Sequence, residues 1–129
     1  MLKTRLLKYT DLMPTIAPAP RDLETLRALA RTVGLASGAV RVVLFGSVAR
    51  GAAHQDSDLD LLLLFPDGAL GQSLFEMTEP IDRAMRALWP LEYPVDFYPM
   101  RLSDFMNRSS LLAEIVAREG VTLFEVAHG

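Results

Sequence analysis

The stretch DLDLLLLF, residues 58 to 65, most constrains the fold because it joins two charges to an unbroken apolar run. Side chains alternate between the two faces of a strand, so Asp58 and Asp60 point one way while the leucine after each of them points towards a core. An apolar run that continues on both faces is typical of a strand in the middle of a sheet. The turn signal Pro-Asp-Gly at 66–68 ends this strand.

Strands and helices alternate along the rest of the chain. Apolar spacing and stop signals predict three longer helices: one over 21–33 that Gly34 ends, one over 74–88, and one from a Ser103 cap to Gly120. A short helix is expected from Val48 to about His54. Strands are predicted over 40–45, over 95–98 between Pro94 and Pro99, and over 121–126 at an edge of the sheet. Pro80 predicts a kink, or a break with Thr78 capping a new helix. This order indicates an α/β (α+β) fold, with helices packed on a single small mixed β-sheet.

The length of 129 residues favours one domain, over 21–126, preceded by an N-terminal arm or linker over 1–20 that contains PTIAPAP. The formal net charge of −3 gives no broad basic field, so general DNA binding is not expected. The chain has no cysteine, which excludes disulfides and fits a reducing compartment. Its apolar runs are far shorter than the ~20 residues of a membrane helix, so we expect a cytoplasmic protein with no membrane partner.

Three aspartates predict a divalent metal site. Asp58 and Asp60 would lie about 7 Å apart on one face of a strand, where two carboxylates repel each other unless a cation lies between them. Solvated residues at a strand end are the alternative interpretation. Asp96 lies alone in a second apolar strand, where a buried charge is otherwise hard to justify. If the strands pair with the three carboxylates on one face, they could hold two Mg²⁺ ions, or Mn²⁺, an arrangement that suits phosphoryl or nucleotidyl transfer.

A Gly-Ser turn precedes these carboxylates. Gly46 lets the backbone approach a ligand closely because it has no side chain. Ser47 can cap the short helix that follows, and its hydroxyl and the helix N-terminus both suit a phosphate. Arg50 could add a charge-assisted contact to the outer phosphates. A plain strand-to-helix turn is the alternative for this segment alone. Because the turn ends one strand and the aspartates open the next, a triphosphate at the turn would lie beside the metal site.

The pattern GSVARG (46–51), SDLDL (57–61) and the later Asp96 resembles the nucleotidyltransferase superfamily typified by DNA polymerase beta. Within it, the chain resembles the minimal nucleotidyltransferases, whose usual C-terminus is similar to LLAEIVAREGVTLFE at 111–125. The resemblance covers roughly residues 21–125. It implies the polymerase beta-like palm fold and transfer of a nucleoside monophosphate, with AMP from ATP as the first candidate, to an acceptor hydroxyl.

The resemblance also implies roles for individual residues. Gly46 and Ser47 would hold the nucleotide phosphates, and Asp58 and Asp60 would bind the divalent metals. Asp96 would complete the metal site and help to deprotonate the attacking hydroxyl. Metal ions would offset the charge of the triphosphate, so that most of the catalysis is positioning and electrostatics.

Members of this family often act with a helical HEPN-type protein as a toxin–antitoxin pair. The resemblance therefore implies an antitoxin that attaches AMP to a tyrosine of its toxin. Two alternatives stay open: an antitoxin that neutralises its partner by binding alone, and transfer to a small molecule such as an aminoglycoside-type antibiotic.

Four further residues are weaker candidates. His54 could contact a phosphate, Arg101 could face the acceptor, and Trp89 and Tyr93 could stack on a base. The simpler interpretations are a polar loop residue for the histidine, a surface salt bridge for the arginine and packing for the two aromatic rings.

Overall fold

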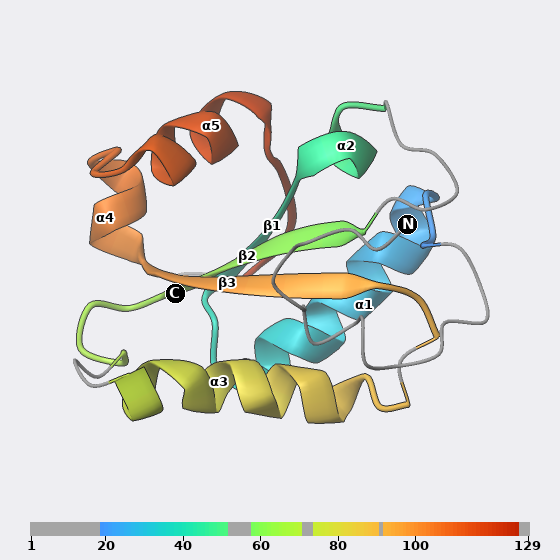
Figure 1. Cartoon of the computed structure of the whole chain (residues 1–129), viewed down its shortest axis with the longest axis horizontal. Helices are drawn as coiled ribbons and strands as arrows, with labels where there is room; N and C mark the ends of the chain where they lie inside the picture. The colour runs from blue at the N-terminus through green and yellow to red at the C-terminus, as the bar shows by residue number, and fades with distance from the viewer. Residues whose placement is uncertain (1–18, 52–57, 71–73, 91, 127–129) are drawn as a thin grey trace, which may run out of the picture.

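The computed structural model describes residues 19–51, 58–70, 74–90 and 92–126, which form one sheet with helices on both faces (Figure 1). The strands are β1 (Arg41–Phe45), β2 (Leu59–Phe65), β3 (Val95–Arg101) and β4 (Val121–Glu125). The helices are α1 (Leu23–Ser37), α2 (Gly46–Ala49), α3 (Leu74–Ala87), α4 (Leu102–Met106) and α5 (Leu111–Glu119). Within these ranges, every helix is too short or too polar to cross a membrane.

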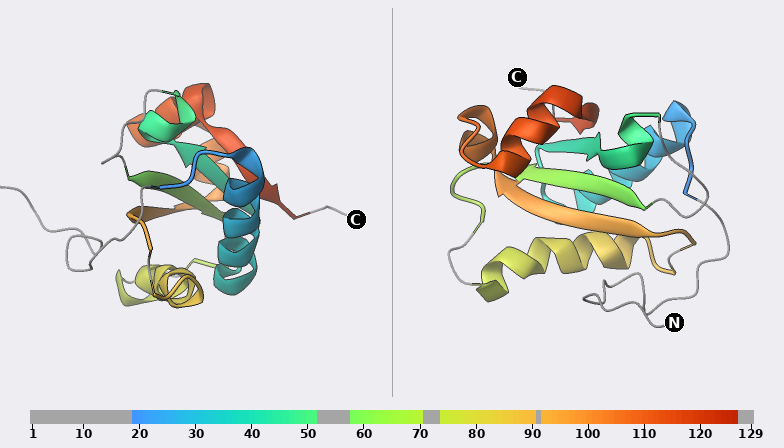
Figure 2. Two further views of the ribbon diagram at one scale, coloured as in Figure 1. Left: turned by 90° about the vertical axis from the view of Figure 1, so that its right-hand side faces the viewer. Right: turned by 45° about the horizontal axis from the view of Figure 1, so that its top comes forward.

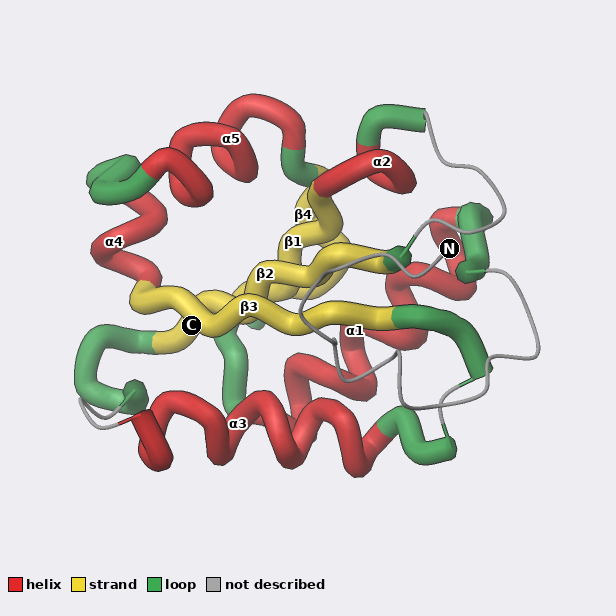
Figure 3. Tube along the Cα trace, in the orientation of Figure 1, coloured by secondary structure: helices red, strands yellow, loops and turns green. Residues whose placement is uncertain are grey.

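The four strands lie in the order β3-β2-β1-β4 (Figure 3). Strand β1 pairs antiparallel with both β2 and β4, whereas β2 and β3 run parallel. The parallel pair is joined by α3, because a parallel connection needs a crossover rather than a tight turn. The predicted mixed sheet with packed helices is therefore confirmed, and β4 lies at an edge as expected.

Helices α1 and α3 cover one face of the sheet, and α4 and α5 cover the other (Figures 1 and 2). Leu59, Leu61 and Leu63 of β2 pack in the core under α1 and α3. Leu62 and Leu64 pack in the core on the opposite face. All five side chains have 0% exposure, and full burial of a leucine contributes about 1.5–3 kcal/mol relative to exposure. Burial on both faces is what the sequence predicts for a central strand.

Helix α1 begins and ends at clear signals. The Asp22 carboxylate accepts a hydrogen bond of 2.9 Å from the backbone N–H of Thr25. The helix ends at Gly38, which has a φ of +84° and donates its N–H to the carbonyl of Gly34. The predicted stop at Gly34 is wrong. That glycine instead lies inside the helix and packs against the ring of Phe124, where a β carbon would collide with the ring.

Helix α3 runs without a break from Leu74 to Ala87, so the predicted break with a cap at Thr78 is wrong. Pro80 lies inside this helix and is buried. It removes one backbone donor, but Ala84 and Met85, about one turn after it, are buried and hold the helix against the core.

The single C-terminal helix expected from Ser103 is two helices. Arg108 has a φ of +51°, which separates α4 from α5. The hydroxyl of Ser110 caps α5 by accepting a hydrogen bond from the N–H of Ala113 at 3.1 Å. Ser103 caps neither helix; its backbone N–H donates to Asp67 instead.

Strand β3 is longer than the predicted 95–98 and passes through Pro99 to Arg101. A proline inside a strand is tolerated because β3 is an edge strand, and its outer side needs no hydrogen-bond donor. Near the start of this strand, Asp96 lies in register with Asp60 of β2.

Candidate active site

Strand β1 leads directly into α2 through Gly46, which has a φ of +80°. A β carbon at this position would collide with Oδ2 of Asp60 and would lie 3.3 Å from its Cγ. Only glycine both adopts this conformation without strain and leaves room for the carboxylate. Gly46 therefore brings the turn into close contact with Asp60 in β2.

Helix α2 is a single turn that begins at Gly46 and ends at Ala49, earlier than the predicted 48–54. Its N-cap is Phe45, with no side-chain cap, so Ser47 lies half-buried in the first turn and does not cap the helix. The helix starts early because the positive φ at Gly46 turns the chain as soon as the strand ends. His54 lies outside the described residues.

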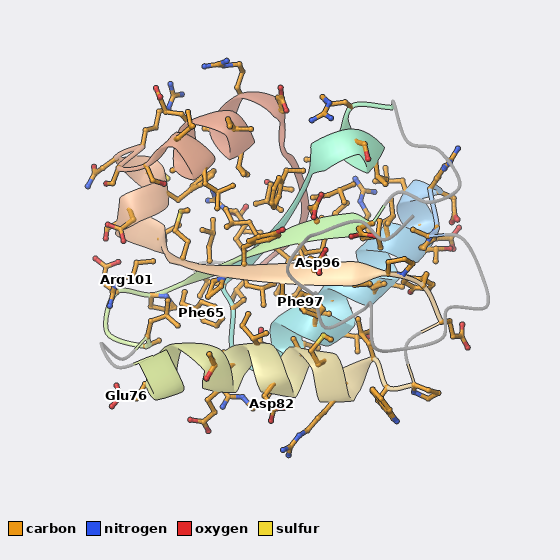
Figure 4. All side chains as sticks on the ribbon, viewed as in Figure 1. Phe65, Glu76, Asp82, Asp96, Phe97 and Arg101 are labelled. Atoms are coloured by element: carbon orange, nitrogen blue, oxygen red, sulfur yellow. The ribbon has the colours of Figure 1, made fainter. Side chains whose placement is uncertain are left out.

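Asp60 lies between Phe45 of β1 and Asp96 of β3 in the sheet register. Phe97 points to the α3 side of β3, so Asp96 faces the opposite side, as alternation requires (Figure 4). Registered neighbours in paired strands share a face. The structure therefore brings the half-buried Asp60 and Asp96 side by side on the face that α4 and α5 cover in part.

Asp58 comes immediately before β2 and is half-buried. Alternation places it on the same face as Asp60, two residues along the chain. The next residue, Leu59, donates its backbone N–H to the carbonyl of Pro94 at 3.0 Å. This hydrogen bond ties the start of β2 to the start of β3, which is the end of the sheet where all three aspartates lie.

Tyr98 is a site residue that the sequence reasoning missed. Its hydroxyl donates to Oδ1 of Asp60 at 3.5 Å, and its ring meets the ring of Phe45 edge-on, with the centroids 5.3 Å apart. The carboxylate of Asp60 thus has Tyr98 against one oxygen and Gly46 against the other. The available signal was spacing: Tyr98 follows Asp96 by two residues and so shares its face.

The donor chemistry of the three aspartates fits a hard cation. Mg²⁺ prefers oxygen ligands and is often held by one or two carboxylates together with substrate phosphates. The adjacent carboxylates of Asp60 and Asp96, beside the Gly46 turn, match that donor set. In the described ranges, no three acidic or histidine side chains stand close enough together to hold a metal by themselves.

Arg50 directly follows α2 and lies near the C-terminal end of α5. Its Nη1 is 3.3 Å from Oε2 of Glu119, and its side chain is about half exposed. The predicted phosphate-binding arginine is therefore in an ion pair that links α2 to α5.

Of the weaker candidates, two behave as expected and one does not. Arg101 forms the expected surface ion pair, with Asp104 at 4.0 Å. Tyr93 is half-buried and packs against the core, as expected. Trp89 does not pack as predicted, because 53% of it is exposed. It follows the last turn of α3, where the chain leaves the core.

Known proteins share this fold and this sequence pattern. The nucleotidyltransferase domain family matches residues 25–117. A solved structure described as a minimal nucleotidyltransferase is 38% identical, with a TM-score of 0.50, and the match covers 78% of this chain and 94% of that chain. No curated protein matches the chain.

Two more distant structures show the fold alone. A protein from Sulfolobus solfataricus described as a nucleotidyltransferase is 22% identical, with a TM-score of 0.53, over 79% of this chain and 78% of that one. A toxin–antitoxin structure with AMP-PNP is 21% identical, with a TM-score of 0.52, over 81% of this chain and 74% of that one.

The family match spans most of the chain and includes Gly46, Asp58, Asp60 and Asp96. The expected nucleotidyltransferase fold is thereby confirmed. The chain belongs to the nucleotidyltransferase domain family, in which it resembles the minimal nucleotidyltransferases.

Proposed function

We propose that this protein is a Mg²⁺-dependent nucleotidyltransferase that moves AMP from ATP to a hydroxyl of a partner protein, as the antitoxin of a toxin–antitoxin pair. The observation that carries the proposal is the pairing of Asp60 with Asp96 beside the close approach of Gly46. Residues 21–126 are proposed to be the catalytic unit. Dependence on ATP and the absence of cysteine both suit the cytoplasm.

The proposed reaction divides the work among a few groups. Gly46 and Ser47 would hold the triphosphate. Arg50 would leave its ion pair with Glu119 and bind the outer phosphates of the nucleotide. Asp58, Asp60 and Asp96 would hold the divalent cations, Mg²⁺ or Mn²⁺, which would supply charge stabilisation for the triphosphate. Asp96 would accept the proton of the acceptor hydroxyl while the oxygen of that hydroxyl bonds to the α-phosphorus. The bond from that phosphorus to the bridging oxygen then breaks, and pyrophosphate leaves.

The choice of nucleotide and of acceptor has separate support. The distant toxin–antitoxin structure contains AMP-PNP, an adenine nucleotide analogue, which favours ATP. That structure also favours a protein partner, and the resemblance to minimal nucleotidyltransferases suggests that the partner is of the HEPN type. An acceptor tyrosine of such a partner would supply the attacking hydroxyl.

The direct test is to incubate the purified protein with Mg²⁺, host lysate and ATP labelled at either the α- or the γ-phosphate. We expect one protein to retain the α-label and none to retain the γ-label. Asp60→Asn should abolish labelling, because one of the paired carboxylates is lost. Asp82→Asn is the matched control, since Asp82 is an exposed partner of Arg86 on α3.

Other outcomes would redirect the assignment. A retained γ-label would indicate a kinase and would overturn nucleotidyl transfer. Neutralisation of the partner that survives in Asp60→Asn would favour an antitoxin that acts by binding alone. Resistance to an aminoglycoside-type antibiotic in a host that expresses the protein, without labelling of a protein, would favour a small-molecule acceptor.

A further inference from the structure

A surface pocket lies between α1 and the segment that joins α3 to β3. Its volume is about 330 Å³, and its lining includes Thr32, Leu88, Trp89, Pro90, Glu92 and Tyr93. Two of these residues, Leu88 and Tyr93, pack against the core that contains Leu59 and Leu61. The pocket is therefore on the α1–α3 side of the sheet, opposite the face that carries Asp60 and Asp96.

The lining combines two aromatic rings with one carboxylate. Trp89 is 53% exposed, and Tyr93 is half-buried. Glu92 is exposed and, in the described part of the chain, forms no ion pair, whereas Glu79 and Asp82 on the neighbouring α3 are each paired with an arginine. Burial raises the pKa of the Tyr93 hydroxyl, and the negative charge of the neighbouring Glu92 raises it further.

We propose that this pocket binds an arginine side chain of a partner protein, with the guanidinium stacked on Trp89 and paired with Glu92. A guanidinium is planar, is always charged and stacks on aromatic faces, and both rings and the carboxylate attract a cation. The volume is at the low end of the roughly 300–1,000 Å³ typical of small-molecule pockets, which suits one side chain. The proposal does not depend on nucleotidyl transfer, because Asp60 and Asp96 lie on the opposite face of the sheet.

The chain offers a built-in reporter, since Trp89 is its only tryptophan. The full chain would be titrated with the peptide acetyl-Gly-Arg-Gly-amide while the tryptophan emission is followed. A saturable change is expected, and the peptide with citrulline in place of arginine should bind at least about five-fold more weakly because it lacks the charge. A lysine peptide should also bind more weakly, because an ammonium does not stack. Equal binding of the citrulline peptide, or no saturable change, would overturn the proposal.

Two variants locate the binding site. Glu92→Gln should lower the affinity for the arginine peptide about five-fold, the size of effect expected at an exposed cation site. Glu79→Gln is the matched control, because this glutamate is on α3 but is outside the pocket lining, and it should leave the affinity unchanged. An equal loss in both variants would mean that the peptide responds to overall charge and not to this pocket.

The chain's own N-terminal segment is the rival occupant, because it contains Lys3, Arg5 and Lys8. The triple variant Lys3→Gln, Arg5→Gln, Lys8→Gln separates the two cases. If wild type and this variant bind the arginine peptide equally, the pocket is open to a partner, as proposed. If only the variant binds the peptide, the chain fills its own pocket and the partner proposal is overturned.

Discussion

Gly46 lies so close to Asp60 that any side chain at residue 46 would overlap a carboxylate oxygen. Gly46→Ala should therefore destabilise the fold and abolish nucleotidyl transfer. Gly38→Ala is a matched control, because Gly38 also has a positive φ but nothing lies within 4 Å of an added β carbon. Both variants should lose about 1–2 kcal/mol from the left-handed conformation, and Gly46→Ala about 1–3 kcal/mol more from the collision. Urea unfolding measures the difference, and equal losses would contradict the close contact.

The Tyr98 hydroxyl gives a second prediction, because it donates to the carboxylate of Asp60. In Tyr98→Phe the ring still packs against Phe45, so thermal stability should change little. Loss of one hydrogen bond is worth about 0.5–1.5 kcal/mol, which predicts a fall in kcat of roughly 2–10-fold with little change in the KM for ATP. Tyr93→Phe, on the other face of the sheet, should leave kcat unchanged. A similar fall in both variants would assign the effect to general packing.

The ion pair between Arg50 and Glu119 predicts opposite effects from its two partners. Glu119→Gln releases Arg50 for the phosphates and should lower the KM for ATP, whereas Arg50→Gln should raise it. Each change in the free energy of unfolding should stay below about 1 kcal/mol, because the pair is partly exposed. Steady-state kinetics with varied ATP tests this, with Arg86→Gln in the exposed α3 pair as control. A higher KM in both variants would mean that Glu119 orients Arg50 for the nucleotide.

Asp22 predicts an acid dependence of stability. Hydrogen bonding to Thr25, first through its side chain and then through its backbone N–H, holds the pKa of this carboxyl below its ordinary value. The folded chain therefore releases this proton more readily than the unfolded chain does, and the stabilisation is complete above the unfolded pKa of about 4. This stabilisation is lost as the pH falls through the lower pKa that Asp22 has in the folded chain.

Thermal unfolding of Asp22→Ala and wild type should thus differ in Tm at about pH 7, and the difference should shrink towards about pH 2. Asp22→Asn keeps an oxygen acceptor without the titrating group, so it should lose less stability at neutral pH. A Tm difference between Asp22→Ala and wild type that is constant across this range would contradict a role for the ionised carboxylate.

The central strand and its neighbours could be predicted because period-two alternation is a local property of the sequence. The leucines of β2 divide between two cores and leave Asp58 and Asp60 together on one face. The same alternation in β3 separates Asp96 from Phe97. A charge that interrupts an apolar strand is a strong signal, because few environments tolerate it.

The remaining features depend on neighbours that are distant in the sequence. Pro99 is accommodated inside β3 only because the topology puts that strand at an edge. The contact of Tyr98 with Asp60 follows from the register of two strands, which no single segment encodes. The left-handed turn at Arg108 interrupts an apolar stripe that otherwise continues, so spacing alone joins α4 and α5 into one helix.

The parallel pairing of β2 with β3 also governs the order in which the site can assemble during folding. Gly46 and Asp60 belong to antiparallel neighbours that are close along the chain, so the pairing of β1 with β2 is enough to bring them together. Asp96 joins them only after the crossover through α3 closes, which is a long-range step and carries a larger entropy cost. Pairing of β1 with β2 alone therefore places the Gly46 turn beside Asp60, whereas Asp96 takes its place in the set only when β3 has paired as well.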